Sequence, residues 1–236
     1  YNVRLFNLFD WIKSPNLEDN MSSFFANNNP DILCLQEYRS YDKIDLSIFP
    51  YHYVQLSGDK IRNGQAIYTK FPIINSGSIK FPQTSNNAIF VDIIKEKDTI
   101  RVYNLHLQSA GIDSNVEKLS QENSESVIKR MTTMFKMQQS QTEQFLAHKN
   151  KCTYKTIISG DFNNTAYSYI YKEIKGDMKD AFEQAGNGFG RTFDFKFFPV
   201  RIDFLLVDDS FDINAFKTYD VKYSDHYPIM AKVKLK

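Results

Sequence analysis

Short apolar runs that end in polar residues constrain the fold of this chain more than any other feature of its sequence. Residues 31–37 (DILCLQE) are apolar from Ile32 to Leu35 and then end in Gln36 and Glu37. An almost wholly apolar run of this length is typical of a strand that is buried on both faces. A buried carboxylate is costly unless it is paired or binds a metal. Glu37 therefore either lies beyond the strand end in water or has a specific function.

Two further apolar runs carry polar residues at or near their ends. In VYNLHLQS, Asn104 and His106 share one face of the predicted strand, because side chains alternate along a strand. A lone histidine at such a place is more often a hydrogen-bonded structural residue. In IISGDFNNT, the strand stops at Gly160 and presents Asp161 and Asn163, for which a turn that caps the next helix is the alternative.

More titratable residues follow in the last part of the chain. Asp203 lies among the apolar residues of VRIDFLLV and needs a partner, and Asp225 and His226 precede the last predicted strand. With the residues above, these form a set of carboxylates, asparagines and two of the four histidines of the chain. Such a set suits metal-assisted hydrolysis of a phosphate, with oxygen ligands for Mg²⁺, imidazoles for the phosphate and a carboxylate for the water.

Periodicity and turn signals predict a chain rich in strands. The predicted helices span residues 16–28, 124–149 and 167–175. The predicted strands span residues 2–9, 31–37, 52–57, 65–70, 73–80, 88–95, 99–107, 154–160, 202–208, 212–220 and 227–235. Many strands with few helices between them predict two sheets packed face to face with helices outside. Without repeats or linker-like stretches, residues 1–236 are expected to form a single domain.

The helix predicted over residues 124–149 has a stripe of mostly apolar residues that indicates a core face: Val127, Met131, Met134, Phe135, Gln138 and Phe145. Before it, Gln108–Ser126 is a long polar stretch with four acidic residues. Loops of that length are usually functional or disordered. Residues Phe189–Phe198 contain five phenylalanines, for which strand packing is favoured over an aromatic platform for a base or an acyl chain.

Charge and composition exclude some classes of protein. Lys and Arg number 29 against 28 Asp and Glu, which argues against a protein whose affinity rests on many phosphate contacts. Cys34 and Cys152 are expected to be free thiols rather than a disulfide. No apolar run is long enough to span a bilayer. Because the chain starts at Tyr1 inside an apolar run, we expect residues upstream of it, where a signal peptide or a membrane anchor would lie.

Seven segments together resemble the endonuclease/exonuclease/phosphatase superfamily, the DNase I-like hydrolases. They occur in the family's order from Asn2 to Pro228: YNVRLF, LCLQEYRS, NGQAIYTKFPI, VYNLHLQS, ISGDFNNT, RIDFLLV and YSDHYPI. The resemblance, which is to a bacterial member, implies an α/β (α+β) fold, a four-layer α/β/β/α sandwich of two mixed β-sheets. It also implies a hydrolase that acts on phosphoester bonds with Mg²⁺, or with Mn²⁺ in its place.

The resemblance also implies roles for individual residues. Glu37 would be the principal magnesium ligand, and Asp225 and Asn2 would complete the site directly or through waters. Two further residues would contact substrate: Asn104 in support of the neighbouring histidine, and Arg39, for which a solvated arginine is the alternative.

The implied catalytic residues come from four segments of the chain. Asp161 would orient and deprotonate the attacking water, and Asn163 would hold the phosphate or the nucleophile beside it. His226 would contact the scissile phosphate, and Asp203 would fix the tautomer of that imidazole. His106 would be a second phosphate contact.

His106 divides the superfamily, because exonuclease III-type repair nucleases have a tyrosine at this position. A histidine there resembles DNase I, the sphingomyelinases, the inositol-polyphosphate phosphatases and the tyrosyl-DNA phosphodiesterase 2 group. The segment Asn63–Gln65 lacks the carboxylate that DNase I would place beside this histidine, and a disulfide pair is not expected. A digestive-type nuclease is therefore disfavoured.

The substrate stays open at this point. Nucleic acid, a lipid head group and a small phosphoester suit the same residues. We expect a phosphodiester, since two histidines and one metal can hold one phosphate from several sides, and the balanced charge favours a short or terminal ester over a long duplex. The alternatives are a true endonuclease on DNA or RNA and a catalytically silent phosphate-binding module. We expect a monomer, with a membrane tether upstream of Tyr1 as an open prospect.

Overall fold

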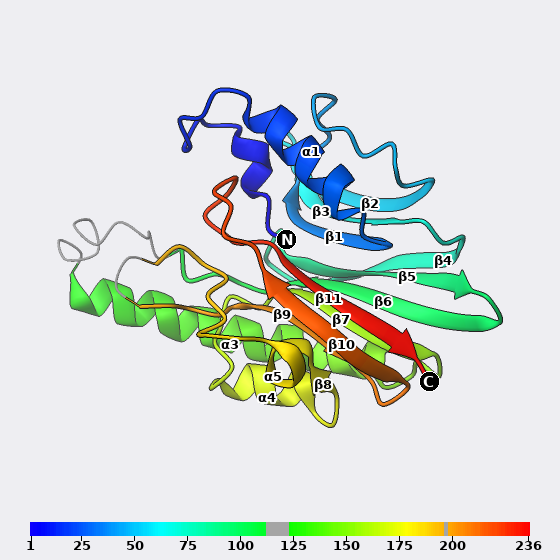
Figure 1. Ribbon diagram of the computed structural model, residues 1–236. Coiled ribbons are helices and arrows are strands. Elements are labelled where there is room, and N and C mark those ends of the chain that lie inside the picture. The colour runs from blue at the N-terminus through cyan, green and yellow to red at the C-terminus, as the bar shows by residue number, and fades with distance from the viewer. Residues whose placement is uncertain (112–122, 196–197) are drawn as a thin grey trace.

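Four layers make up the molecule, and the strands lie in the middle two (Figure 1). The computed structural model describes residues 1–111, 123–195 and 198–236. The first sheet has the order β1–β3–β2 and is antiparallel: β1 (Ile32–Tyr38), β3 (Asn63–Thr69) and β2 (Tyr51–Ser57). The helix α1 (Leu17–Asn28) covers its outer face.

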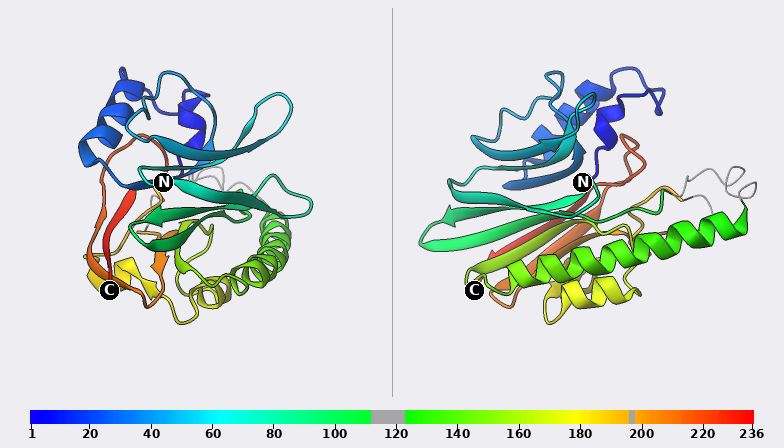
Figure 2. Two further views of the ribbon diagram at one scale, coloured as in Figure 1. Left: turned by 90° about the vertical axis from the view of Figure 1, so that its right-hand side faces the viewer. Right: turned by 180° about the vertical axis from the view of Figure 1, so that it is seen from behind.

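The second sheet is larger and mixed, because β6 and β7 pair in parallel while its other neighbours pair antiparallel. Its order is β4 (Ile73–Lys80), β5 (Asn87–Lys95), β6 (Asp98–His106), β7 (Lys155–Asp161), β9 (Asp203–Val207) and β8 (Lys179–Asp180). The helices α3 (Ser124–Lys149) and α4 (Tyr169–Lys175) cover its outer face (Figure 2). A two-stranded antiparallel sheet of β10 (Phe211–Thr218) and β11 (Ile229–Leu235) lies beside β9, and α5 (Ala181–Ala185) follows β8.

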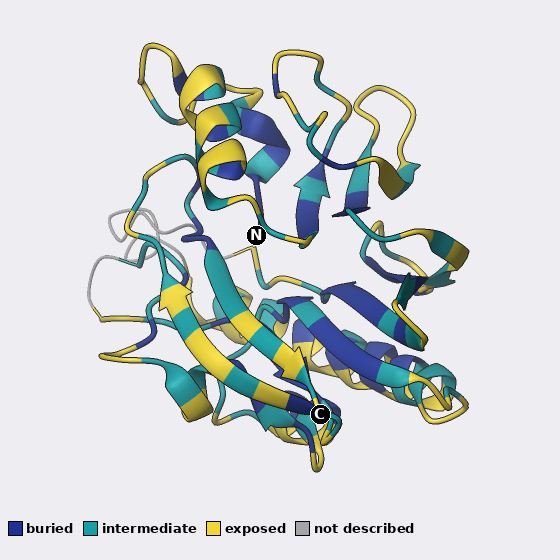
Figure 3. Cartoon of the chain, turned by 45° about the vertical axis from the view of Figure 1, so that its right-hand side comes forward, coloured by how far each residue is buried: buried dark blue, intermediate teal, exposed yellow. Residues whose placement is uncertain are grey.

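Three apolar clusters hold these layers together, and their strands appear as buried in Figure 3. In β1, Leu35 packs toward α1 while its neighbour Cys34 packs between the two sheets. Adjacent side chains thus enter opposite cores, which explains why this strand is apolar without alternation. On the far side, Phe145 of α3 and Ile174 of α4 pack against the outer face of β6.

The structure confirms the predicted sandwich with helices outside and most of the predicted elements. The helix predicted over residues 124–149 is α3, Ser124–Lys149, whose first turn is capped by the Asn123 side chain, which accepts from the Glu125 amide. Both cysteines are free thiols, as expected. Among the described residues, no helix is long and apolar enough to cross a membrane. Sequence reasoning missed the short elements β8 and α5.

The strand predicted over residues 2–9 is wrong. Asn2 forms a single bridge to Gln36, and a helical turn, η1 (Arg4–Asn7), follows it. All four residues of this turn have positive φ, between 43° and 58°, a conformation that L-residues adopt only at a cost. Hydrogen bonds on both sides hold it: Asn2 Oδ1 accepts from the Arg4 amide, and Leu5 O accepts from the Arg39 guanidinium. The apolar residues of the turn are buried, so an apolar run alone could not distinguish it from a strand.

Candidate active site

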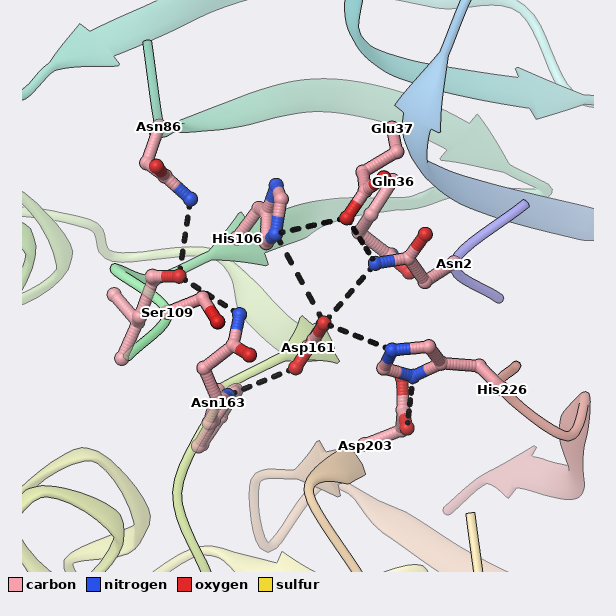
Figure 4. Close-up of polar contacts among 12 residues, drawn as sticks. Asn2, Gln36, Glu37, Asn86, His106, Ser109, Asp161, Asn163, Asp203 and His226 are labelled. Carbon is pink, nitrogen blue, oxygen red and sulfur yellow. Dashed lines mark hydrogen bonds and ion pairs between the residues drawn. The ribbon is translucent and has the colours of Figure 1, made fainter. Parts of the chain in front are cut away.

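Six polar side chains from distant parts of the chain converge where the ends of β1, β6, β7 and β9 meet the N-terminal segment (Figure 4). They are Asn2, Glu37, His106, Asp161, Asp203 and His226. Parallel pairing of β6 with β7 places His106 directly opposite Asp161. Antiparallel pairing of β7 with β9 places Asp203 opposite Asp161 on its other side. The register of one sheet thus brings three of the six together.

A β-bulge directs Glu37 toward this group. The register of β1 against β3 shifts between Gln36 and Tyr38, and Glu37 takes a φ of 48°. A bulge of this kind leaves one residue out of the ladder and turns its side chain. A non-glycine residue in the left-handed region is strained, and such strain is common at functional sites. The Glu37 side chain is 36% exposed, so its carboxylate is open to a ligand.

Asn2 joins the two carboxylates at the centre of the site. Its Nδ2 donates to Glu37 Oε1 and to Asp161 Oδ2, each at 3.1 Å. Its Oδ1 accepts from the Arg4 amide at 3.0 Å. Asn2 therefore orients the two carboxylates, and its Oδ1 keeps a second lone pair. Its place beside Glu37 is compatible with the metal-site role that the resemblance implied, which stays a prediction.

Asp161 lies at the centre of the cluster and is almost wholly buried. Its Oδ1 accepts from the Asn163 amide at 2.8 Å, and its Oδ2 lies 3.6 Å from His226 Nε2 and 3.9 Å from His106 Nε2. Burial raises its pKa, against the opposing charge of His226. The preceding residue must be glycine, because a Cβ on Gly160 would lie 2.0 Å from the Leu105 carbonyl oxygen on β6.

His226 and Asp203 form a buried pair. His226 Nδ1 lies 2.9 Å from Asp203 Oδ2, and both side chains are almost fully shielded from solvent. Burial works against the charged imidazolium, but the charges of Asp203 and Asp161 outweigh it and raise the pKa of His226 to about 10. The imidazole is therefore a cation at neutral pH, and its Nε2 points toward Asp161 (Figure 4).

His106 completes the ring of groups around Asp161. Its Nε2 lies 3.9 Å from Glu37 Oε1 and at the same distance from Asp161 Oδ2, and 15% of its side chain is exposed. Asn163 lies at the opposite side, with a φ of 48° and its side-chain amide donating to the Leu107 carbonyl at 3.0 Å. These imidazoles, carboxylates and amides can bind an anion, polarise it and exchange a proton with a bound water.

Three of the residues predicted for the site form their described hydrogen bonds and ion pairs outside the group of six. Asn104 is fully buried between the sheets, where its amide bonds Gln36 and the Leu35 and Ala66 carbonyls, so it has no group left for a substrate. We revise its role to a link between the two sheets. Arg39 donates to Leu5 O at 2.6 Å and stacks on Tyr41, and no described contact joins it to the cluster.

Asp225 is the third of these residues. Its Oδ2 pairs with Arg4 Nη1 at 3.1 Å, and its Oδ1 accepts from the Ser224 hydroxyl. The charge of Asp225 also contributes to the raised pKa of His226, so Asp225 lies near the cluster, and its role as a metal ligand stays a prediction. The partner is a residue that sequence reasoning missed, since 221 positions separate Arg4 from Asp225 and nothing in either segment indicates the other.

The donor set fits a hard cation at Glu37. Mg²⁺ and Mn²⁺ take oxygen ligands, and within the described residues no hydrogen bond reaches Glu37 Oε2. The described residues also hold one group of three ligand-type side chains with atoms within 4.8 Å of one another, Asp161, Asp203 and His226. Two of these three are already bonded to each other, and the third faces an imidazolium. The partly exposed Glu37 therefore fits a cation better than the buried trio does.

The phenylalanine-rich segment lies against the His226 imidazole. Phe193 forms bridges to Val200 and to His226, and its ring lies 5.0 Å from the His226 ring, edge to face. The segment is not a regular strand, as the packing interpretation supposed, and its residues 196–197 lie outside the described part of the chain. The predicted loop Gln108–Ser126 also lies largely outside the described residues.

Comparisons with known proteins agree with this fold. The model of the endonuclease/exonuclease/phosphatase family, whose members include hydrolases of phosphoester bonds, matches residues 1–226. No curated protein sequence matches the chain. An endonuclease/exonuclease/phosphatase structure from Bacteroides vulgatus is 17% identical with a TM-score of 0.75, covering 100% of this chain and 97% of that one.

Two solved structures with specific names are also similar. A mannosyl-6-phosphatase from Bacteroides thetaiotaomicron is 17% identical with a TM-score of 0.67, covering 93% of this chain and 91% of that one. A humanized TDP2 from D. rerio is 14% identical with a TM-score of 0.69, covering 99% of this chain and 96% of that one. At these identities the likeness shows the fold, while the family match spans nearly the whole chain. The chain therefore belongs to the endonuclease/exonuclease/phosphatase family.

Proposed function

We propose that this chain is a divalent-metal-dependent phosphodiesterase that uses an activated water. The observation that carries the proposal is the meeting of Asp161 with the buried His226–Asp203 pair on one side and with Glu37 and Asn2 on the other. A carboxylate with a raised pKa beside a cationic imidazole supplies both a proton acceptor and a group that attracts phosphate oxygens.

The protonated His226 would donate from Nε2 to a non-bridging oxygen of the phosphate. Because Asp203 holds Nδ1 at 2.9 Å, the ring is fixed before the substrate arrives, so no reorganisation is needed in the transition state. His106 Nε2 faces the same space from β6 and would contact a second phosphate oxygen. The two imidazoles would hold the phosphate between them.

Asp161 would orient the attacking water and take its proton through Oδ2. Asn2 Nδ2 and the Asn163 amide each bond one oxygen of this carboxylate and so fix the direction of the acceptor lone pairs. Glu37 would hold Mg²⁺ or Mn²⁺. When bound, the cation would neutralise charge on the phosphate and on the departing oxygen.

A panel assay tests the proposal. Wild-type protein would be incubated with Mg²⁺, with Mn²⁺ and with EDTA on bis-p-nitrophenyl phosphate, p-nitrophenyl phosphate, sugar and inositol phosphates, sphingomyelin, DNA and RNA. We expect hydrolysis of a diester that needs the metal and is lost in Asp161→Asn. His52→Gln is a matched control, because His52 lies on β2 and stacks on Tyr68 away from the site. Phosphate binding without turnover on any substrate would instead indicate a silent binding module.

We further propose that the diester is short or terminal rather than a long duplex. The charge balance of 29 against 28 leaves no surplus of cations to cover a long polyanion. The salt dependence of kcat/KM on duplex DNA and on a small diester tests this point. A preference for the duplex with a log–log slope steeper than about −4 would reveal a local basic face and overturn the substrate assignment.

A further inference from the structure

Gln138 is a fully buried polar residue on the face of α3 that packs against the sheet. Its residue exposure is 0%, and the neighbouring buried residues of the helix include Met134 and Phe145. A buried amide is retained in such a place only when its hydrogen bonds are satisfied. Its partners lie neither in the helix nor among the charged groups of the site. They lie in the two loops that follow His106 and Asp161 in the chain.

Both ends of the Gln138 amide are engaged. Nε2 donates to Gln108 O at 2.7 Å, to Phe162 O at 3.1 Å and to Asn163 O at 3.3 Å. Oε1 accepts from Asn164 Nδ2 at 2.8 Å. The reverse orientation of the amide would place its oxygen against three carbonyl oxygens, so the neighbours fix which way it points.

These partners belong to the two loops that follow the catalytic strands. Gln108 lies two residues after His106, and Phe162 and Asn163 directly follow Asp161. The loops also bond each other, through the Leu107 amide to Asp161 O and through the Asn163 side chain to Leu107 O. Asn163 has a φ of 48°, a conformation that persists only where the surroundings enforce it.

We propose that Gln138 is a positioning residue that ties the loop after β6 to the loop after β7 and so sets the placement of His106 against Asp161. This inference rests on the proposed function for its effect on turnover. Gln138 does not reach the reacting atoms itself. It acts through backbone carbonyls, and displacements of about 1 Å at a reacting group are enough to lower rates strongly.

Gln141 provides a matched control on the same helix. It lies three residues further along α3 and is buried to a similar degree, and its Oε1 accepts from the Gln108 amide at 2.9 Å. Its bond reaches only the loop after β6. Replacing either glutamine by methionine removes a buried amide of the same shape and size, but only the change at Gln138 removes bonds that reach both loops.

The experiment compares Gln138→Met with Gln141→Met in two readouts. The first is steady-state kinetics on the diester that the wild type hydrolyses, at a temperature well below the unfolding midpoints of both variants. We expect Gln138→Met to lower kcat by about 10-fold or more with KM within about 3-fold, since the phosphate contacts remain. Gln141→Met should change kcat by less than about 3-fold.

The second readout is backbone amide hydrogen exchange over residues 105–109 and 160–164, which does not depend on activity. Gln138→Met should speed exchange in both loops, and Gln141→Met only in residues 105–109. If the wild type hydrolyses no phosphoester, the proposed function fails, and exchange alone decides whether the tie exists. Equal kinetic losses in the two variants, or faster exchange in one loop only for Gln138→Met, would overturn the inference.

A milder variant covers the case in which Gln138→Met does not fold. Asn164→Ala removes the donor that orients the Gln138 amide and leaves the core unchanged. It should lower kcat by about 3-fold or more at constant KM and speed exchange at residues 161–164. Unchanged kcat and unchanged exchange in this variant would also overturn the inference.

Discussion

Asp203→Asn tests the buried pair that Asp203 forms with the His226 imidazole. The substitution keeps the shape of the side chain and removes its charge. It leaves a neutral amide at the place where Asp203 Oδ2 now lies 2.9 Å from His226 Nδ1. Because an amide can present either an oxygen or an N–H to the ring, the substitution also removes the group that fixes which ring nitrogen carries the proton.

The structure gives the size of the expected change. The pKa of His226 is raised from 6.5 to about 10, and Asp203 is the strongest of the groups that raise it. Loss of an adjacent opposite charge shifts a pKa by about 1–3 units, so we expect a value near 8 in the variant. At pH 8, about 1% of the wild-type imidazole and about half of the variant imidazole would then be neutral. The smaller fraction of protonated imidazole therefore lowers kcat/KM at pH 8 by about 2-fold. The loss of the fixed ring orientation lowers it further, to about 10²-fold below the wild-type value.

The assay is a ring-nitrogen NMR titration in EDTA together with kinetics at pH 8. The chain has four histidines, so their signals can be assigned by single substitutions. His226→Ala and the double variant complete a cycle of kinetic measurements. An unshifted His226 titration with unchanged rates would refute the pairing. So would losses that simply multiply in the double variant, because groups that act as a unit are not additive.

Three more predictions follow from the same geometry. Glu37→Gln should weaken Mn²⁺ binding by about 10-fold or more, measured by electron paramagnetic resonance, and abolish most turnover; undiminished turnover of the wild type in excess EDTA would contradict the metal site. Gly160→Ala should cost about 3 kcal/mol or more of unfolding free energy, since its Cβ would meet the Leu105 carbonyl at 2.0 Å. Gly188→Ala, also at positive φ but with open space, should cost about 1 kcal/mol, and equal costs would contradict the clash. In EDTA, the stabilisation from His226 should be complete below about pH 6.5 and lost as pH rises toward 10, because its folded pKa lies above its unfolded value; urea unfolding at several pH values would show a flat profile if this is wrong.

Most of the fold was predictable because burial leaves a direct trace in the sequence. The run Ile32–Leu35 is apolar on both faces because it separates two cores. The core face predicted for the helix Ser124–Lys149 is confirmed at Met134, Gln138 and Phe145, whereas Phe135, which was assigned to the same face, is 44% exposed. The turn at Arg4–Asn7 was not predictable, since its left-handed backbone depends on hydrogen bonds from Asn2 and Arg39. Tertiary contacts decided the local conformation there.

The candidate site was predictable to the extent that its residues lie at the ends of strands. His106 and Asp161 stand where strands end and Asp203 where one begins, and the register of the sheet places the three side by side. The roles of the amide side chains were harder to predict, because a glutamine within a predicted core face, such as Gln138, gives no sign of its function until its hydrogen-bond partners are known. Its bonds reach residues 24–30 positions away, a separation for which the sequence gives no signal.

One assay tests most directly whether the groups around Asp161 form a metal-dependent active site. It measures hydrolysis of bis-p-nitrophenyl phosphate by the wild type and by Asp161→Asn, with Mn²⁺ and with EDTA. The substitution removes one charge from the most buried carboxylate of the cluster and keeps its shape. We expect turnover by the wild type with Mn²⁺, none above background in EDTA, and a loss of at least about 10²-fold in the variant at unchanged unfolding midpoint. Equal rates in the two proteins, or equal wild-type rates with and without metal, would contradict the account.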